Sequence, residues 1–351
     1  MRRLRWGAPH PFNLLCALLC ALLCAPSQSA ACPGCQNPNL PITPTGGVFL
    51  DERSVQWGAL LTIAPLWVTH EAGCRDLKRC DESPTQPLFL HDQQLTPSEL
   101  RLTLDLGLSE RLGVSAQLPL RLVHTTITYR LSNGDPYTPL DAGIHHRDET
   151  LIGVGDALLA LRWSQPLTLT PLEGWWFIGQ LGLTLPFGHT EPNPFSAGAR
   201  GEAHQHIQFG TGTLDPLLSL SLARAWRTWQ LNLYGQASGA LYDNKWGYQG
   251  GLTSLLNAEL SYTLQPRALL HLGGAWFTQG AERWDGQIQQ DGVLGRRELL
   301  LAVGGTVSFG GPQYRLLLRF PLWRELIQGP LTERGALSAP LSVTVGVQGG
   351  L

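Results

Sequence analysis

The sequence is poor in charge and contains almost no methionine. Its 351 residues include a single Met, and Asp, Glu, Lys and Arg together make up 15%. The formal net charge is −2, so the chain lacks the basic excess typical of nucleic-acid binding, and we expect no nucleic-acid partner. Hydrophobic residues make up 43%, which is too few for a bundle of membrane-spanning helices and too many for a disordered chain.

Long apolar runs are missing as well, apart from one at the amino terminus. Three arginines within the first five residues precede an apolar stretch over residues 14–25, and small residues follow as far as Ala31. This pattern is typical of a secretory signal peptide, and we predict that residues 1–31 are cleaved. The sequence Ser29-Ala30-Ala31-Cys32 leaves a second processing route open, the lipidation of Cys32. No later run reaches the roughly 18 apolar residues of a spanning helix, so the exported chain crosses a membrane only if it forms a closed β-barrel.

What the sequence does contain is an alternation of period two, repeated about twelve times between Val55 and Leu351. In one stretch Leu100, Leu102, Leu104, Leu106 and Leu108 alternate with Arg101, Thr103, Asp105, Gly107 and Ser109. Successive side chains of a strand point to opposite faces, so each stretch predicts a strand with one apolar and one polar face.

The connections between these stretches alternate between short and long, with two mild exceptions. The short ones cover residues 109–112, 225–227, 265–267 and 310–312, and the long ones cover residues 70–97, 130–152, 186–212, 278–295 and 324–339. Bacterial outer-membrane barrels have tight periplasmic turns and longer extracellular loops. We therefore predict an all-β, transmembrane antiparallel barrel of about twelve strands over residues 55–351, in the outer membrane. Residues 32–54 form a leader rich in Cys, Pro and Gly that either hangs in the periplasm or plugs the lumen.

The period also assigns each side chain to lipid or to the lumen. The apolar positions are expected to contact outer-membrane lipid, because a charge near the bilayer midplane costs about 2–4 kcal/mol. The polar positions are expected to line the lumen: Arg101, Asp105, Arg121, Asp156, Arg162, Asp215, Glu259, His271, Glu298, Arg315 and Arg319. Residues 246–264 are predicted as one long strand, with Trp246, Tyr248 and Tyr262 in aromatic belts at its ends.

Five short motifs resemble a known family. They are Gly153-Val154-Gly155-Asp156, Leu185-Pro186-Phe187-Gly188, the segment from Phe209 to Pro216, Asn244-Lys245-Trp246-Gly247-Tyr248, and the segment from Phe320 to Gly329. Together they resemble the outer-membrane transporter family named for the meta-pathway of phenol degradation, over roughly residues 153–351. The resemblance implies an outer-membrane barrel of Gram-negative bacteria that moves small hydrophobic or aromatic compounds, and it assigns no substrate-binding residue.

Cysteines and histidines are the candidates for further chemistry. Of the seven cysteines, Cys32, Cys35, Cys74 and Cys80 remain after signal cleavage, and an even number in an oxidising compartment favours disulfides, Cys74 with Cys80 and Cys32 with Cys35. Capture of copper or zinc by Cys32 and Cys35, or redox exchange there, stays open as an alternative. His145, His146, His204 and His206 lie in long loops and would bind a metal only if the two loops meet over the barrel mouth.

Two functions remain open, and neither is enzymatic. No serine lies in a Gly-x-Ser-x-Gly motif, and neither strand-borne histidine, His124 or His271, has a nucleophile at an interpretable spacing, so we expect no catalysis and no cofactor. In the first hypothesis the barrel conducts small hydrophobic or aromatic solutes, which are collected by four aromatic residues of the mouth loops: Phe187, Phe195, Phe209 and Trp284. In the second it is a closed structural barrel whose loops or Cys32 and Cys35 bind a metal or a partner.

Overall fold

The structure is a computed structural model of the chain. It describes residues 39–42, 52–72, 87, 89–139, 147–167, 174–200, 202–288, 293–328 and 335–351. The predicted signal peptide, residues 1–31, and most of the predicted leader, residues 32–54, lie outside the described residues. Within the described ranges no helix is long and apolar enough to cross a membrane.

Twelve antiparallel strands form a closed ring. In chain order they are β1 (Val55–Ile63), β3 (Phe89–Gly107), β4 (Leu112–Leu131), β6 (Ala157–Pro166), β7 (Trp175–Leu185), β8 (Pro216–Trp226), β9 (Trp229–Ser238), β11 (Thr253–Gln265), β12 (Ala268–Gln279), β15 (Val293–Ser308), β16 (Gln313–Gln328) and β18 (Ser342–Gly350). The ring closes where β1 pairs with β18, from Gln56 opposite Gly350 to Ile63 opposite Val343. The prediction of an all-β antiparallel barrel of about twelve strands is confirmed, and closure removes the free edges that an open sheet would expose.

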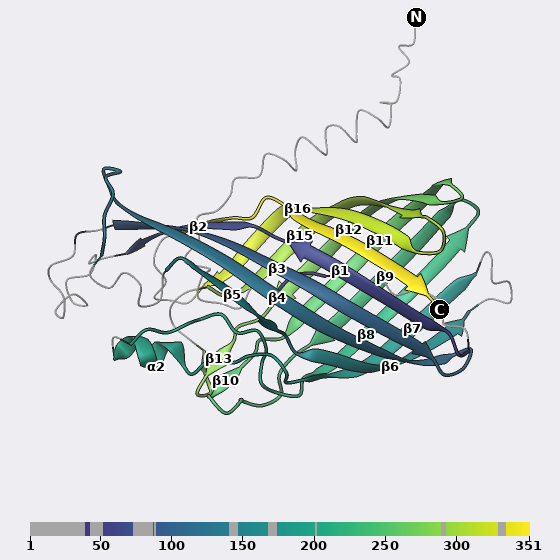
Figure 1. Cartoon of the computed structure of the whole chain (residues 1–351), viewed down its shortest axis with the longest axis horizontal. Helices are drawn as coiled ribbons and strands as arrows, with labels where there is room; N and C mark the ends of the chain where they lie inside the picture. Colours follow the sequence, from purple (N-terminus) through teal and green to yellow (C-terminus); the bar gives the residue numbers. More distant parts are fainter. Residues whose placement is uncertain are drawn as a thin grey trace, which may run out of the picture.

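The two ends of the barrel differ, as the lengths of the connections predict. At the end that we call the short-turn end, β8 and β9 are joined by a tight turn in which Arg227 has a φ of 47°. Gly310 and Gly311, with φ of 62° and 124°, make the turn between β15 and β16. Positive φ strains any residue with a Cβ, so two glycines suit that turn. The opposite end, which we call the long-loop end, carries the long connections, and β3 and β4 project far beyond the other strands there (Figure 1).

Further strands are added at the long-loop end. β2 (Leu66–Ala72), β5 (Glu149–Val154) and β17 (Gly335–Ser338) join β3 and β4 in the order β17-β2-β3-β4-β5, and we call this five-strand region the extension sheet. A separate small sheet contains β10 (Tyr248–Gln249), β13 (Arg283–Trp284) and β14 (Gln287–Ile288). This sheet and the short helix α2 (Pro194–Ala199) also lie at the long-loop end (Figure 1).

The barrel is apolar on the outside and polar on the inside. On β6, the outward-facing Leu161 is 64% exposed, whereas its neighbour Arg162 faces inward and is 4% exposed. This is the reverse of a soluble protein, in which large apolar side chains are buried. An outer surface of exposed leucines is what a lipid bilayer requires.

The hydrogen-bond ladder of the ring has two gaps at the long-loop end. β16 pairs with β18 only as far as Arg319 opposite Ser342, and beyond that point the described residues of β16 pair with β15 alone. On the other side of the extension sheet, β5 pairs only with β4 among the described strands. Pro321 and Pro340 lie at the first gap, and proline has no N–H to offer to a ladder.

The prediction of one long strand over residues 246–264 is wrong. Tyr248 and Gln249 form β10 in the small sheet, and the barrel strand β11 begins only at Thr253. Gly250 and Gly251 separate the two, and a Cβ at Gly251 would overlap the backbone of Gly280. Tyr248 is therefore a buried residue of the small sheet, whereas Tyr262 faces outward as predicted and contacts the ring of Trp229 at 4.8 Å between centroids.

Candidate functional site

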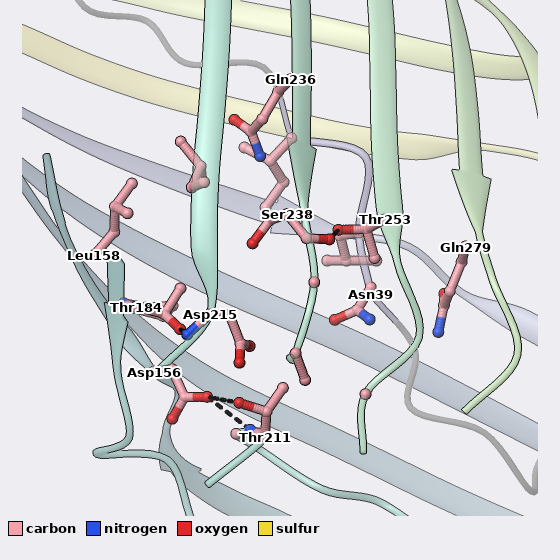
Figure 2. A pocket seen from close by; sticks show the side chains of 18 of the residues that line it. Asn39, Asp156, Leu158, Thr184, Thr211, Asp215, Gln236, Ser238, Thr253 and Gln279 are labelled. Atoms are coloured by element: carbon pink, nitrogen blue, oxygen red, sulfur yellow. Dashed lines mark hydrogen bonds between the residues drawn. The ribbon is translucent and has the colours of Figure 1, made fainter. Parts of the chain in front are cut away.

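A cavity of about 180 Å³ lies inside the barrel, at the level where β7, β8, β9, β11 and β12 end towards the long loops. Figure 2 shows Gln236 and Ser238 of β9 and Thr253 of β11 on one side of this space, with Asp156 and Thr211 on the other. The apolar part of the wall includes Leu40, Ile42, Leu158, Leu217, Leu255 and Phe277. The cavity is therefore amphipathic, with apolar side chains set among amide, hydroxyl and charged groups.

Part of the leader forms one wall of this cavity. Residues 39–42 lie within the lumen, and Ile42 is buried. The guanidinium of Arg296 donates a hydrogen bond to the backbone carbonyl of Asn39, and it also lies over the ring of Phe277, 5.2 Å from the centroid. This short segment of the leader thus narrows the lumen at the level of the cavity.

A second wall comes from the long connection between β7 and β8, which folds back into the barrel. Phe209 is buried, and its ring lies so close to Gly153 of β5 that any Cβ at that position would overlap it. Nη1 of Arg121 donates a hydrogen bond to the carbonyl oxygen of Phe209 at 3.0 Å. Glycine at position 153 therefore makes room for an aromatic ring inside the barrel, a reason that the sequence pattern alone does not reveal.

Apolar side chains fill the space between this connection and the extension sheet. The cluster consists of Leu66, Val68, Leu95, Val123, Ile207 and Phe209, with Leu151, Leu337 and Ala339 packed against it. Inward-facing positions of the extension sheet thus carry an apolar cluster, although His91, Gln93 and Thr125 are buried there as well. The connection is held in place by burial of this surface.

A charged cluster stands beside the cavity on β3 and β4. Nη2 of Arg101 lies 2.6 Å from Oε1 of Glu99, and Nε of Arg121 lies 3.0 Å from its Oε2. Glu99 faces inward and is almost completely buried, yet the sequence analysis omitted it. Its residue number is odd, like those of Arg101 and Asp105, so extending the period-two alternation by one residue places it on the inward face.

Asp156 joins two loop segments rather than standing free in the lumen. The N–H of Gly188 donates to its Oδ1 at 2.9 Å, and the N–H and hydroxyl of Thr211 donate to its Oδ2 at 2.6 and 2.9 Å (Figure 2). Asp215 accepts a hydrogen bond from the hydroxyl of Thr213. Asp156 therefore shapes the cavity wall by anchoring the backbone of two loop segments, and both carboxylates are already engaged in hydrogen bonds within the protein.

The lower lumen, towards the short-turn end, is filled by a polar network. Nδ1 of His271 lies 2.8 Å from the hydroxyl of Ser261, and its Nε2 lies 2.7 Å from that of Thr306. Arg315 donates to Glu259, whose Oε1 lies 3.5 Å from the same histidine. His271 is 6% and Arg319 only 2% exposed, so water hardly reaches these side chains. The network leaves little room for an open aqueous pore at this level.

The other predicted lumen residues also face inward. Arg162 and Asp105 are buried on β6 and β3. Glu298 is buried beside Arg324, with 2.6 Å between Nε and Oε1. Arg101, Arg121, Asp156 and Asp215 line the cavity itself. Whether any of the predicted residues contacts a transported solute stays a prediction.

The small sheet covers the cavity at the barrel mouth. Tyr248 lines the cavity, and its hydroxyl donates to Oε2 of Glu282 at 3.1 Å. The ring of Trp284 lies 4.8 Å from that of Tyr248. Burial raises the pKa of Glu282 to about 7, and the hydrogen bond from Tyr248 offsets this only in part.

Two of the four aromatic residues expected to collect solutes at the mouth are buried. Trp284 is only 2% exposed, and Phe209 points into the lumen, so neither of them is presented to the solvent. Phe187 is exposed, and the side chain of Phe195 lies outside the described residues. Tertiary packing decided this difference, because an aromatic residue in a loop has the same sequence signature whether it is buried or free.

The candidate disulfides and most of the candidate metal ligands cannot be placed. Cys32, Cys35, Cys74, Cys80, His145 and His146 lie outside the described residues. The rings of His204 and His206 are 5.0 Å apart, edge to face. Among the described residues, no three or more His, Cys, Asp or Glu side chains are grouped as a metal site would need. The disulfides and the metal site both stay predictions.

Comparison with known proteins bears on the fold. No protein-family model and no curated protein matches the sequence. The crystal structure of an outer membrane channel from Pseudomonas putida F1 matches with a TM-score of 0.57 and 13% identity, covering 88% of this chain and 100% of that one. The chain has the fold of an outer-membrane channel. Two matches have lower TM-scores. The P. putida toluene transporter TodX has a TM-score of 0.41 and 9% identity, and the match covers 86% of this chain and 91% of that one. A Pseudomonas aeruginosa FadL homologue has a TM-score of 0.38 and 11% identity, and the match covers 93% of this chain and 98% of that one.

Proposed function

We propose that this chain is an outer-membrane channel for small hydrophobic or aromatic solutes. We also propose that it belongs to the transporter family named for the meta-pathway of phenol degradation, on the motifs described above. The observation that carries the function is the amphipathic cavity of about 180 Å³ inside a barrel with an apolar exterior. A cavity of about 150 Å³ in another protein is known to hold benzene, so a single aromatic ring fits the space.

The filled lower lumen supports a small and weakly polar solute over an ion or a sugar. A hydrophilic solute needs a continuous water path, and the buried polar network around His271 and Arg319 leaves little space for one. β5 pairs only with β4 among the described strands and lies beside Phe209, and we propose that an apolar solute crosses the wall there, a route that a charged solute would not take.

Filling the cavity tests this proposal. Leu255 of β11 faces the cavity, whereas its neighbour Leu256 faces outward. In a Gram-negative host without its own channel for the solute, we expect Leu255→Trp to lower uptake of radiolabelled toluene several-fold, and Leu256→Trp to leave it unchanged. Both variants should show the heat-modified gel mobility of a folded barrel.

Equal uptake by the wild type, by Leu255→Trp and by cells without the protein would contradict the channel. That result would favour the alternative of a closed structural barrel whose loops or Cys32 and Cys35 bind a metal or a partner. Growth of the cells on toluene as a carbon source is not needed for the test, because uptake is measured directly.

A further inference from the structure

Three arginines face outward from the described strands of the barrel: Arg130, Arg224 and Arg297. Two of them have a carboxylate partner on the neighbouring strand. Nη2 of Arg130 donates to Asp92 at 3.2 Å, and Nη1 of Arg297 lies 3.0 Å from Oε2 of Glu325. Arg224 has no ion pair with any described residue. It is the exception that needs an explanation, because an unpaired charge on a lipid-facing surface is unfavourable.

Arg224 lies close to the short-turn end of β8. The outward positions before it are Leu218, Leu220 and Leu222, so the strand changes from an aliphatic surface to a cation at this point. Trp226 follows on the same face, and the turn to β9 comes directly after it. The arginine is therefore at the depth where the hydrocarbon of a bilayer gives way to its headgroups, and where the cost of a charge falls to about 0–1 kcal/mol.

Two indole rings hold the guanidinium group. Trp175 stands directly opposite Arg224 in the register of β7 and β8, and its ring centroid is 5.2 Å from Cζ. The ring of Trp226 is 5.6 Å from the same atom. Stacking on aromatic faces orients a guanidinium without satisfying its N–H donors. The residue is exposed, and no described residue accepts a hydrogen bond from its guanidinium, so its donors can bind an anion from outside the protein.

The site is part of a continuous aromatic belt. Trp226 is paired in register with Trp229, and Trp229 with Tyr262. Tryptophan and tyrosine gather at the level of lipid headgroups because one part of each ring system is apolar and the other polar. Of the three outward-facing arginines on described strands, Arg224 is the one that lies in this belt. At this depth the anionic group that a positively charged residue contacts is the phosphate of the lipid headgroups.

We propose that Arg224, Trp175 and Trp226 form a binding site for the phosphate group of a phospholipid in the membrane leaflet at the short-turn end. The planar guanidinium matches two phosphate oxygens at once, which a lysine does not. The indole rings pack beside the glycerol and the first methylene groups of the same lipid. This site rests on the proposed function only in requiring that the barrel is in a membrane, and it does not depend on what the lumen conducts.

Native mass spectrometry of the full-length mature barrel, reconstituted in phosphatidylglycerol vesicles and released into mild detergent, tests the site. We expect one phosphatidylglycerol to remain bound, and Arg224→Gln to lower its occupancy about tenfold, the effect of losing one charged hydrogen-bonding partner. Arg224→Lys should lose most of the occupancy, because it keeps the charge and loses the fork. The matched control is Arg267→Gln, at an exposed arginine of the turn between β11 and β12 for which the structure describes no ring contact.

Several outcomes would overturn the site. Equal phosphatidylglycerol occupancy in the wild type, Arg224→Gln and Arg267→Gln would show that retention is unspecific. Displacement of the lipid by millimolar inorganic phosphate would show an anion site that does not select lipid. A wild-type barrel that fails to enter vesicles would overturn the membrane placement and the site together, whereas a barrel that enters them but shows no effect of Arg224→Gln overturns the site alone.

Discussion

The two halves of this barrel are built on different principles. In the half at the short-turn end, strands alternate strictly, turns are tight, and the inward face carries a polar network that includes His271 and Arg315. In the half at the long-loop end, the ladder has gaps, the inward face of the extension sheet carries an apolar cluster, and a loop with Phe209 folds into the lumen. The first half makes a wall, and the second half makes a cavity.

The difference shows how a closed barrel can hold a small-molecule site. A complete ladder with a filled interior is stable and impermeable, because every edge is paired and each inward side chain has partners. A barrel with a cavity has an interior that is only partly filled, and its ladder is interrupted at that level. Here the leader at Asn39–Ile42 and the loop at Phe209 occupy the upper lumen instead of strands. Both segments are held by side-chain packing and a few hydrogen bonds and not by a strand ladder, so they can be displaced more easily than strands.

Breaking the charged cluster between the halves should have the largest effect on stability. Glu99→Gln removes a buried carboxylate and leaves the partly buried Arg101 and Arg121 without their ion-pair partner, which costs about 3 kcal/mol, the lower end of the range for a broken buried pair. We expect a clear fall in the midpoint of guanidinium unfolding in detergent. Glu325→Gln, in an exposed ion pair with Arg297, should cost at most about 1 kcal/mol. Similar losses in the two variants would mean that Glu99 is not buried as described.

The lipid contact of the half at the short-turn end can be tested by placing a charge on its apolar outward face. Leu161→Arg places a charge on the outward face near the middle of β6, where lipid contact makes it cost about 2–4 kcal/mol. The matched control is Leu108→Arg, at an exposed leucine just beyond the short-turn end of β3, which should cost about 0–1 kcal/mol. Urea unfolding in lipid vesicles measures both. If the two arginines cost the same, the apolar belt does not contact hydrocarbon.

The smallest effect should come from pH and should be confined to the small sheet at the mouth. The pKa of Glu282 is raised to about 7 from 4.5, so the folded sheet binds the proton more tightly than the unfolded segment does. Its stability is therefore complete below about pH 4.5 and is lost as the pH rises through about 7. Trypsin cleavage after the exposed Arg283 should become faster over this range relative to Glu282→Gln.

In that experiment Glu282→Gln is the control for trypsin activity, because trypsin itself works faster as the pH rises and acts on both proteins alike. The ratio of the two cleavage rates removes this effect. A ratio that stays constant from pH 5 to pH 8.5 would contradict a buried, titrating Glu282. Barrel unfolding should be unaffected throughout, since the small sheet is separate from the ring.

How far the fold could be predicted differs between the same two halves. The alternation around Leu100–Leu108 and the short connections were sufficient for the strand number and for the assignment of Arg101, Asp105 and Arg121 to the inward face. The strand predicted over residues 246–264 failed because period two continues through Tyr248, although Gly250 and Gly251 let the chain turn into the small sheet. Glu99 was missed for a simpler reason, since the alternation was followed only from Leu100 onwards.

The amino-acid pattern by itself determined the all-β barrel, its two kinds of connection and, along the strands that alternate regularly, which side chains face inward and which face outward. These properties follow from local geometry, because a strand has a fixed period and a turn needs particular residues. Only the tertiary structure decided that Phe209 enters the lumen opposite Gly153, that Trp284 is buried, and that Arg224 lies beside Trp175. Such contacts join residues far apart in the chain, and it is the closing of the ring and the folding of the loops that bring them together.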